Sequence, residues 1–234
     1  NVGGISVVKT YTLQRGSYAI GVSHALSNQS PAPIAPQLYL QLLRDGNKPA
    51  GESAFYSTFT GPAVYTEAKK YQKVEFTDIK KKNAEYEKQA SNGYIAMVQH
   101  YFASAWILPD GVSRSISLDG VDTPGTLADC CYRAAMVAPV EAIAPGTSRS
   151  VEATLFVCPQ EEKMLEALAP GLELLKDYGW LTILAKPLYW LLDRLHSVIQ
   201  NWGWAIVALV LLLKIAFYWL NAKAYESMAK MKAV

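Results

Sequence analysis

Hydrophobic and polar residues follow two different patterns along the chain. Up to about residue 158, short segments with alternating apolar and polar positions are separated by turn residues, which is typical of half-buried β-strands. The turns contain pairs such as Asp45-Gly46, Asn92-Gly93 and Asp110-Gly111, which supply backbone angles that most residues avoid. The pattern therefore predicts a mainly β domain, an antiparallel sandwich, over residues 1–159. Its strands are expected at 5–13, 18–26, 37–43, 74–79, 94–108, 114–118, 130–137 and 151–157.

The repeat of apolar positions changes to that of a helix after residue 160. Residues 160–178 are expected to form a connecting helix, and Pro170-Gly171 should kink or divide it. The apolar residues at helical spacing in this segment are Met164, Leu165, Leu168, Leu172 and Leu175.

Residues 179–200 predict an amphipathic helix, with leucines on one side and Lys186, Asp193 and Ser197 on the other. Pro187 would suit its first turn. The segment is too polar to span a membrane, so we expect it to lie flat on the outer surface. Trp180 and Trp190 would then sit at the interface. The alternative is a helix that docks on the β-domain.

The most apolar part of the chain runs from Trp202 to Leu220. In an α-helix these nineteen residues would span about 28 Å, close to the roughly 30 Å of a hydrocarbon core. We expect a transmembrane helix over residues 201–221, with Trp202 and Trp204 at the membrane interface. The only charge in the run is Lys214, which costs on the order of 3 kcal/mol to insert.

Two interpretations of Lys214 remain open. Its side chain could extend toward the interface beyond Leu220, as lysines near helix ends do. Alternatively, Tyr218 and Asn221 share its helix face at i+4 and i+7, and a polar stripe of this kind indicates a water-filled cavity between helices.

The charges that follow the span predict its orientation. Lys223, Lys230 and Lys232 outnumber Glu226, so residues 222–234 should be cytoplasmic. Residues 1–200 would then lie outside, in the periplasm of a Gram-negative organism. Because no signal peptide or earlier span precedes the domain, we expect the natural protein to begin upstream.

Composition narrows the function. The 234 residues carry a net charge of +2 and are 51% hydrophobic, which favours neither nucleic-acid binding nor disorder. No metal-spaced ligands, paired carboxylates, nucleophile elbow or phosphate loop occur, so we expect no cofactor and no enzyme.

If residues 130–138 and 151–158 form a hairpin, Cys158 could bond to Cys130 or Cys131. The alternative is that all three cysteines are small buried hydrophobes.

Several motifs resemble the YidC-type membrane protein insertases of Gram-negative bacteria, in the YidC/Oxa/Alb family. The likeness covers essentially the whole chain. The motifs that carry it are Leu13-Gln14-Arg15-Gly16-Ser17-Tyr18, Ala96-Met97-Val98-Gln99-His100-Tyr101-Phe102, Tyr178-Gly179-Trp180, Lys186-Pro187-Leu188, His196-Ser197, Asn201-Trp202-Gly203 and Ser227-Met228-Ala229-Lys230-Met231.

The resemblance implies part of a periplasmic β-supersandwich, an interfacial helix and the second of six transmembrane helices in an inner-membrane protein. In that family the second span carries a positive residue, usually arginine, in a hydrophilic groove that is open to the cytoplasm and the lipid. Lys214 would occupy this position, but it lacks the planar group with which arginine binds a carboxylate through two hydrogen bonds. Tyr218 and Asn221 would line the same groove. The implied partners are nascent membrane proteins, the Sec translocon, the lipid bilayer and, indirectly, ribosomes. The rival hypothesis is a membrane-tethered carbohydrate-binding or mutarotase-like sandwich that uses His24 or His100 as acid and base. A third is a tethered structural module.

Overall fold

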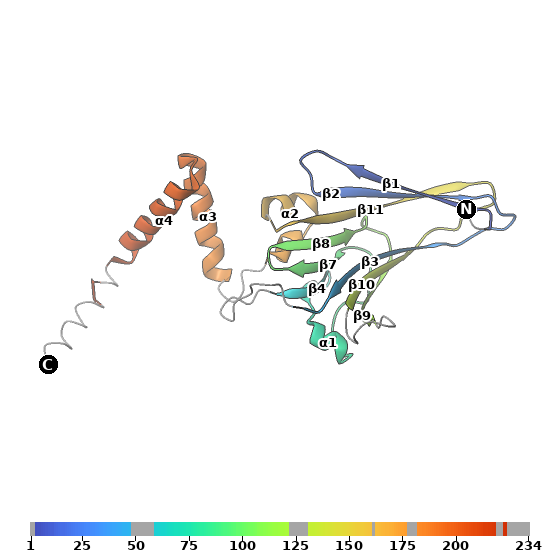
Figure 1. The fold of residues 1–234 in the computed structure, drawn as a ribbon, viewed down its shortest axis with the longest axis horizontal. Coiled ribbons are helices and arrows are strands. Elements are labelled where there is room, and N and C mark those ends of the chain that lie inside the picture. The colour runs from blue at the N-terminus through green and yellow to red at the C-terminus, as the bar shows by residue number, and fades with distance from the viewer. Residues whose placement is uncertain are drawn as a thin grey trace. The chain divides into compact units, whose positions relative to one another are not determined.

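The computed structural model describes residues 3–47, 59–121, 131–160, 162–176, 182–218 and 222–223. The chain divides into two compact units, Asn1–Asp177 and Tyr178–Val234, which we describe separately (Figure 1).

The first unit contains two antiparallel sheets, in agreement with the predicted sandwich. The larger sheet has seven strands in the order β1-β2-β11-β8-β7-β4-β5. In that order their bounds are Ile5–Leu13, Ala19–Asn28, Ser148–Pro159, Phe102–Ile107, Tyr94–Gln99, Thr60–Thr66 and Lys70–Lys73. The smaller sheet has four strands in the order β3-β10-β9-β6. Their bounds are Gln37–Asp45, Cys131–Pro139, Arg114–Val121 and Gln89–Ala90.

The seven-stranded sheet is covered on both faces near β7, and the sequence of β7 reflects this. Ile95 and Met97 point into the core between the two sheets, whereas Ala96 and Val98 point into a second core. All four residues are buried, so this strand is a continuous apolar run instead of an alternating one. Side chains alternate between faces of a strand, so each core receives every second residue.

The second core is closed by the helical segment that follows β11. This segment consists of α2, Glu162–Leu168, and the short 3₁₀ helix η1, Leu172–Leu175. Leu165, Leu172 and Leu175 are fully buried against the sheet. The predicted division at Pro170-Gly171 is confirmed, because α2 ends before this pair and η1 begins after it.

The two sheets are also joined by polar contacts. The Trp106 indole Nε1 on β8 donates a 3.0 Å hydrogen bond to the Gln41 carbonyl on β3.

At the other side of the larger sheet, β1 has a different environment. Within the described residues it pairs only with β2, and most of its side chains are exposed, including Val7, Tyr11 and Leu13.

Two expectations about the strands are wrong. The segment 94–108 is a hairpin of β7 and β8, because His100 turns the chain with a φ of 38°. The segment 74–79 mostly belongs to the short helix α1, Phe76–Lys80, whose first turn contains Asp78. The hairpin of 130–138 and 151–158, which was one of two alternatives for the cysteines, does not form, since β10 and β11 lie in different sheets.

The last difference bears on the cysteines. Cys131 on β10 is half-buried, and Cys158 on β11 is buried. Cys130 lies outside the described residues. The hairpin that would have brought Cys158 beside Cys130 or Cys131 does not form, because β10 and β11 belong to different sheets.

Within its described residues, the second unit contains the helices α3, from Thr182 to Ile199, and α4, from Trp202 to Ala216. Pro187 lies inside α3 and not in its first turn as expected, because the helix already begins by Thr182. Among the described residues, no helix combines the length and the apolar character that crossing a membrane requires.

A backbone hydrogen bond and a side-chain cap fix the turn between α3 and α4. Gln200 has a φ of 55°, and its N–H donates a 2.7 Å hydrogen bond to the His196 carbonyl. The Asn201 side-chain oxygen then caps α4 by accepting a 3.2 Å hydrogen bond from the Trp204 N–H. The helices pack at Ala205, which is fully buried.

Candidate functional site

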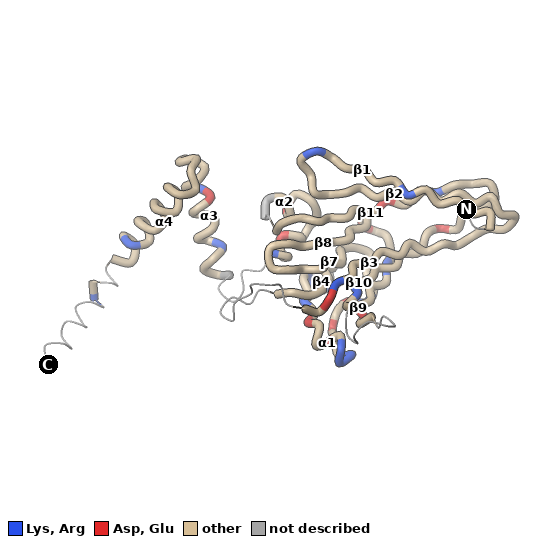
Figure 2. Tube along the Cα trace, viewed as in Figure 1, with Lys and Arg blue, Asp and Glu red and all other residues tan. Residues whose placement is uncertain are grey.

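Lys214 lies in the last turn of α4 and is the one charged residue between Trp202 and Ala216. In Figure 2, α4 is tan apart from one blue segment. Lys214 and its apolar neighbours Leu211 and Ile215 are all exposed. In the described part of the chain, no carboxylate lies within ion-pair distance of Lys214. The cation therefore stands on a largely apolar helix surface.

The polar stripe predicted below Lys214 is described only in part. Phe217 ends α4, with φ −94° and ψ 7°. Tyr218 follows this residue and is exposed, whereas Asn221 lies outside the described residues. The shared helix face of Lys214, Tyr218 and Asn221 therefore stays a prediction.

The predicted interface tryptophans occupy three different settings. The Trp190 ring lies 5.6 Å from the Arg194 guanidinium on the next turn of α3. The Trp202 ring stacks on His196 with centroids 3.8 Å apart and planes 9° apart. Trp204 is exposed, and Trp180 lies outside the described residues. Trp202 thus helps to hold the α3–α4 turn.

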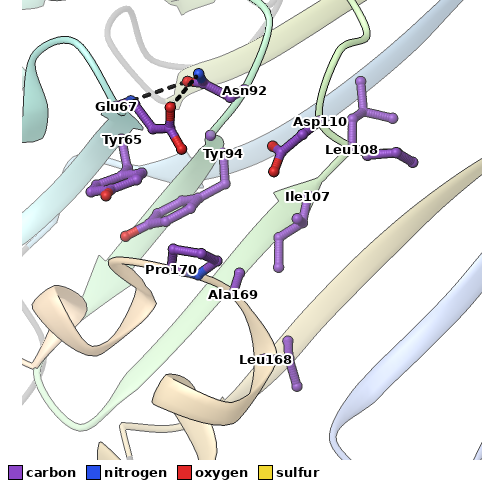
Figure 3. A pocket seen from close by; sticks show the side chains of 12 residues that line it. Tyr65, Glu67, Asn92, Tyr94, Ile107, Leu108, Asp110, Leu168, Ala169 and Pro170 are labelled. Carbon is purple, nitrogen blue, oxygen red and sulfur yellow. Dashed lines mark hydrogen bonds between the residues drawn. The ribbon is translucent and has the colours of Figure 1, made fainter.

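A second candidate site, which sequence reasoning missed, is a pocket of about 210 Å³ in the β-domain. Ile107, Leu168, Ala169 and Pro170 provide apolar walls. Figure 3 shows the carboxylates of Glu67 and Asp110 on either side of Tyr94. The sequence identified Asn92-Gly93 and Asp110-Gly111 only as turns, and Glu67 is far from Asp110 along the chain.

Tyr94 connects the wall of the pocket to the helical segment. Its hydroxyl donates a 2.7 Å hydrogen bond to the Gly171 carbonyl, and its ring stacks on Tyr65 with centroids 5.3 Å apart. Burial raises the pKa of the Tyr94 phenol far above its usual value, and nearby Tyr71, Glu173 and Tyr65 raise it further. The phenol is thus a neutral hydrogen-bond donor at physiological pH.

Arg114 shapes the loops that carry Asp110 and Asn92. This side chain is buried, and its guanidinium donates to five backbone carbonyls. These belong to Val112, Gly93, Leu108, Ser91 and Pro109. Burial lowers the pKa of the guanidinium, and the Asp110 carboxylate counteracts this effect. The Arg114 guanidinium therefore uses its donors to hold the backbone of these loops in place.

The histidines of the rival hypothesis lie apart from one another. His100 is in the β7–β8 turn, with its ring 3.8 Å from that of Tyr101. His24 lines a larger cavity of about 530 Å³ between β1, β2 and β3. None of the described residues lining that cavity is a carboxylate, so His24 has no acidic partner there. Burial lowers the pKa of His24, and the nearby Lys9 lowers it further.

Comparison with known proteins identifies the family. A family model described as the YidC periplasmic domain matches residues 1–191. The chain belongs to the YidC family. Relatives named membrane protein insertase YidC, from Burkholderia vietnamiensis and Burkholderia lata, are 53% and 54% identical over 232 residues. The match covers 99% of this chain but only 41% and 40% of those YidC proteins, so the chain spans about two-fifths of their length.

Two of the solved structures that match this chain resemble it only weakly. A TPR-domain containing protein from Parabacteroides distasonis has a TM-score of 0.40 at 9% identity, covering 66% of this chain and 30% of that one. A galactose mutarotase related enzyme from Lactobacillus acidophilus has a TM-score of 0.38 at 10% identity, covering 66% and 61%. Likenesses this weak carry no argument about function.

Proposed function

We propose that this chain works as part of a membrane protein insertase and chaperone, which helps nascent inner-membrane proteins to insert and fold without acting as an enzyme. The observation that carries this proposal is the 53% identity to proteins named membrane protein insertase over 99% of the chain. The match includes the β-domain as well as the segment of α3 and α4. The likeness therefore extends to the residues proposed for function.

The proposed arrangement assigns each segment to one side of the membrane. Residues 1–159, part of a larger β-supersandwich, would lie in the periplasm and be linked through residues 160–178. Residues 179–200 would lie along the outer membrane surface, residues 201–221 would cross the bilayer, and residues 222–234 would begin the cytoplasmic part. The exposed apolar residues of α4 support this proposal, because lipid can cover them.

Lys214 would act inside the membrane as a groove cation. Its exposure on an otherwise apolar helix supports this role. A positive charge in a water-filled groove attracts acidic and polar segments of a nascent protein, and so lowers the cost of moving them into the bilayer. Tyr218 and Asn221 would add hydrogen-bonding groups on the cytoplasmic side. Apolar segments of the same client could then move directly into lipid.

Substitution of Lys214 in the full-length protein tests this role. In cells depleted of their own insertase, Lys214→Ala is expected to lose insertion of clients that do not need the Sec translocon. Lys214→Arg should retain insertion, because it keeps the charge. Ile215→Ala, at the next residue of the helix, which is also exposed, is the matched control and should insert normally. Equal insertion by the Lys214→Ala and wild-type proteins would exclude the groove role and leave a lysine that only extends to the interface.

The proposed partners follow from this function. Nascent membrane proteins would be the clients, and the Sec translocon would share some of them. Ribosomes, and with them nucleic acid, would be met only through the nascent chain. The lipid bilayer would contact α3 and α4 directly, with Trp180, Trp190, Trp202 and Trp204 at its interface.

A further inference from the structure

The pocket beside Tyr94 has a size that fits one side chain. Its volume of about 210 Å³ is below the roughly 300–1,000 Å³ of pockets that enclose drug-sized ligands. It opens at the surface between the β-sheet and the end of α2, where Pro170 is exposed. One side chain of a bound peptide could therefore enter the pocket while a neighbouring residue of the peptide lies on the exposed surface of Pro170.

The chemistry of the pocket fits a long side chain with an apolar stem and a cationic end. Ile107, Leu168 and Ala169 line it with apolar surface. The carboxylates of Glu67 and Asp110 flank Tyr94 (Figure 3). Lysine and arginine have this combination of an apolar stem and a charged head.

Both carboxylates are available to such a ligand. In the described part of the chain, neither forms an ion pair. Glu67 is held in place by Asn92, whose side chain accepts from the Glu67 N–H at 3.0 Å and donates to Glu67 Oε2 at 3.3 Å. Arg114 is near Asp110, but its N–H groups are directed to backbone carbonyls.

We propose that this pocket binds a lysine or arginine side chain presented by a peptide segment of another protein. The methylene stem packs between Ile107 and Ala169, and the cationic head lies between Glu67 and Asp110. Because the pocket belongs to the β-domain, this binding does not depend on the groove role of Lys214. The β-domain thereby acquires a contact site for basic peptides.

The first test compares peptides that differ only in charge. The probe is the peptide acetyl-Leu-Lys-Leu-amide with a neutral fluorophore, titrated with the 234-residue chain in detergent micelles and followed by fluorescence anisotropy. The control peptide has norleucine in place of lysine, which keeps the stem and removes the charge. The lysine peptide is expected to bind at least about tenfold more tightly, and this difference should shrink at high salt. Equal binding of the two peptides would overturn the proposal.

The second test changes the pocket. Glu67→Gln and Asp110→Asn each remove one charge with little change in shape, and each should weaken the lysine peptide by about threefold. The double variant should weaken it by about tenfold or more. Glu152→Gln, which alters an exposed carboxylate on β11 outside the pocket, is the matched control and should bind normally. A double variant that melts like the wild type and still binds the lysine peptide with wild-type affinity would refute the assignment.

Discussion

The hydroxyl of Tyr94 on β7 donates a 2.7 Å hydrogen bond to the carbonyl of Gly171, 77 residues further along the chain. This bond fastens the segment between α2 and η1 to the seven-stranded sheet. Both groups are buried away from water, so neither can easily find another partner.

Removal of this hydroxyl should destabilise the β-domain. Tyr94→Phe leaves the Gly171 carbonyl without its buried donor, and we expect a loss of about 1–3 kcal/mol in the free energy of unfolding. The measurement is urea denaturation of the 234-residue chain. Tyr39→Phe is the control, because the Tyr39 hydroxyl bonds to Gln41 at an exposed position. The control should change stability by less than about 0.5 kcal/mol, and an equal loss in both variants would contradict the importance of the buried bond.

Alkaline pH should act through the same phenol. The pKa of Tyr94 is raised in the folded protein, so above about pH 10 the unfolded chain releases this proton while the folded chain retains it. The stabilising contribution is complete below pH 10 and falls as the pH rises further. Denaturation curves between pH 9 and pH 11.5 should therefore show a steeper loss for the wild type than for Tyr94→Phe. Parallel losses would show that other groups dominate the alkaline range.

Gly171 should tolerate no side chain. Its φ is 78°, and an added Cβ would come within 2.2 Å of the Tyr65 ring. Gly171→Ala therefore combines backbone strain of about 1–2 kcal/mol with displacement of a stacked aromatic ring. Gly111→Ala provides the comparison, since Gly111 has a φ of 84° and open space around it. We expect Gly171→Ala to lower the melting temperature clearly more than Gly111→Ala, and equal shifts would rule out the steric contribution.

Arg114 should not be replaceable by lysine. Its planar guanidinium serves five carbonyls from different positions in the loops, whereas an ammonium has three donors and no fork. Arg114→Lys should cost about 3 kcal/mol in unfolding free energy. Arg149→Lys, at an exposed arginine paired with Glu141, should cost less than about 0.5 kcal/mol. A similar small cost at both positions would show that the loops do not depend on the planar guanidinium of Arg114.

The sequence predicted those strands whose pattern is local. β3 has one face on the core and one toward solvent, so its alternation was informative. β4 was missed because Gly61-Pro62 resembles a turn, although Pro62 lies within the strand opposite Met97. β7 and β8 were merged because His100 adopts a positive φ that glycine usually provides.

The pairing of strands could not be derived in the same way. β2 pairs with β11, which joins Ser27 to Ser148, and no local signal specifies a partner so far along the chain. The two candidate sites differ, for the same reason, in how far the sequence could reveal them. Lys214 was recognisable as one charge in an apolar run, whereas Glu67 and Asp110 become neighbours of one pocket only through the order β8-β7-β4.

The edge position of β1 has a consequence for how copies of this chain behave at high concentration. An unpaired strand edge can act as a template for another sheet, and an inward-facing lysine is a common natural protection against this. Lys9 occupies the middle of β1, with its ammonium 5.0 Å from the Tyr11 ring centroid. A second β1 laid along this edge would have to bury that charge. Lys9 therefore favours solubility over self-assembly, so that the seven exposed residues of β1 can remain accessible without joining molecules into fibres.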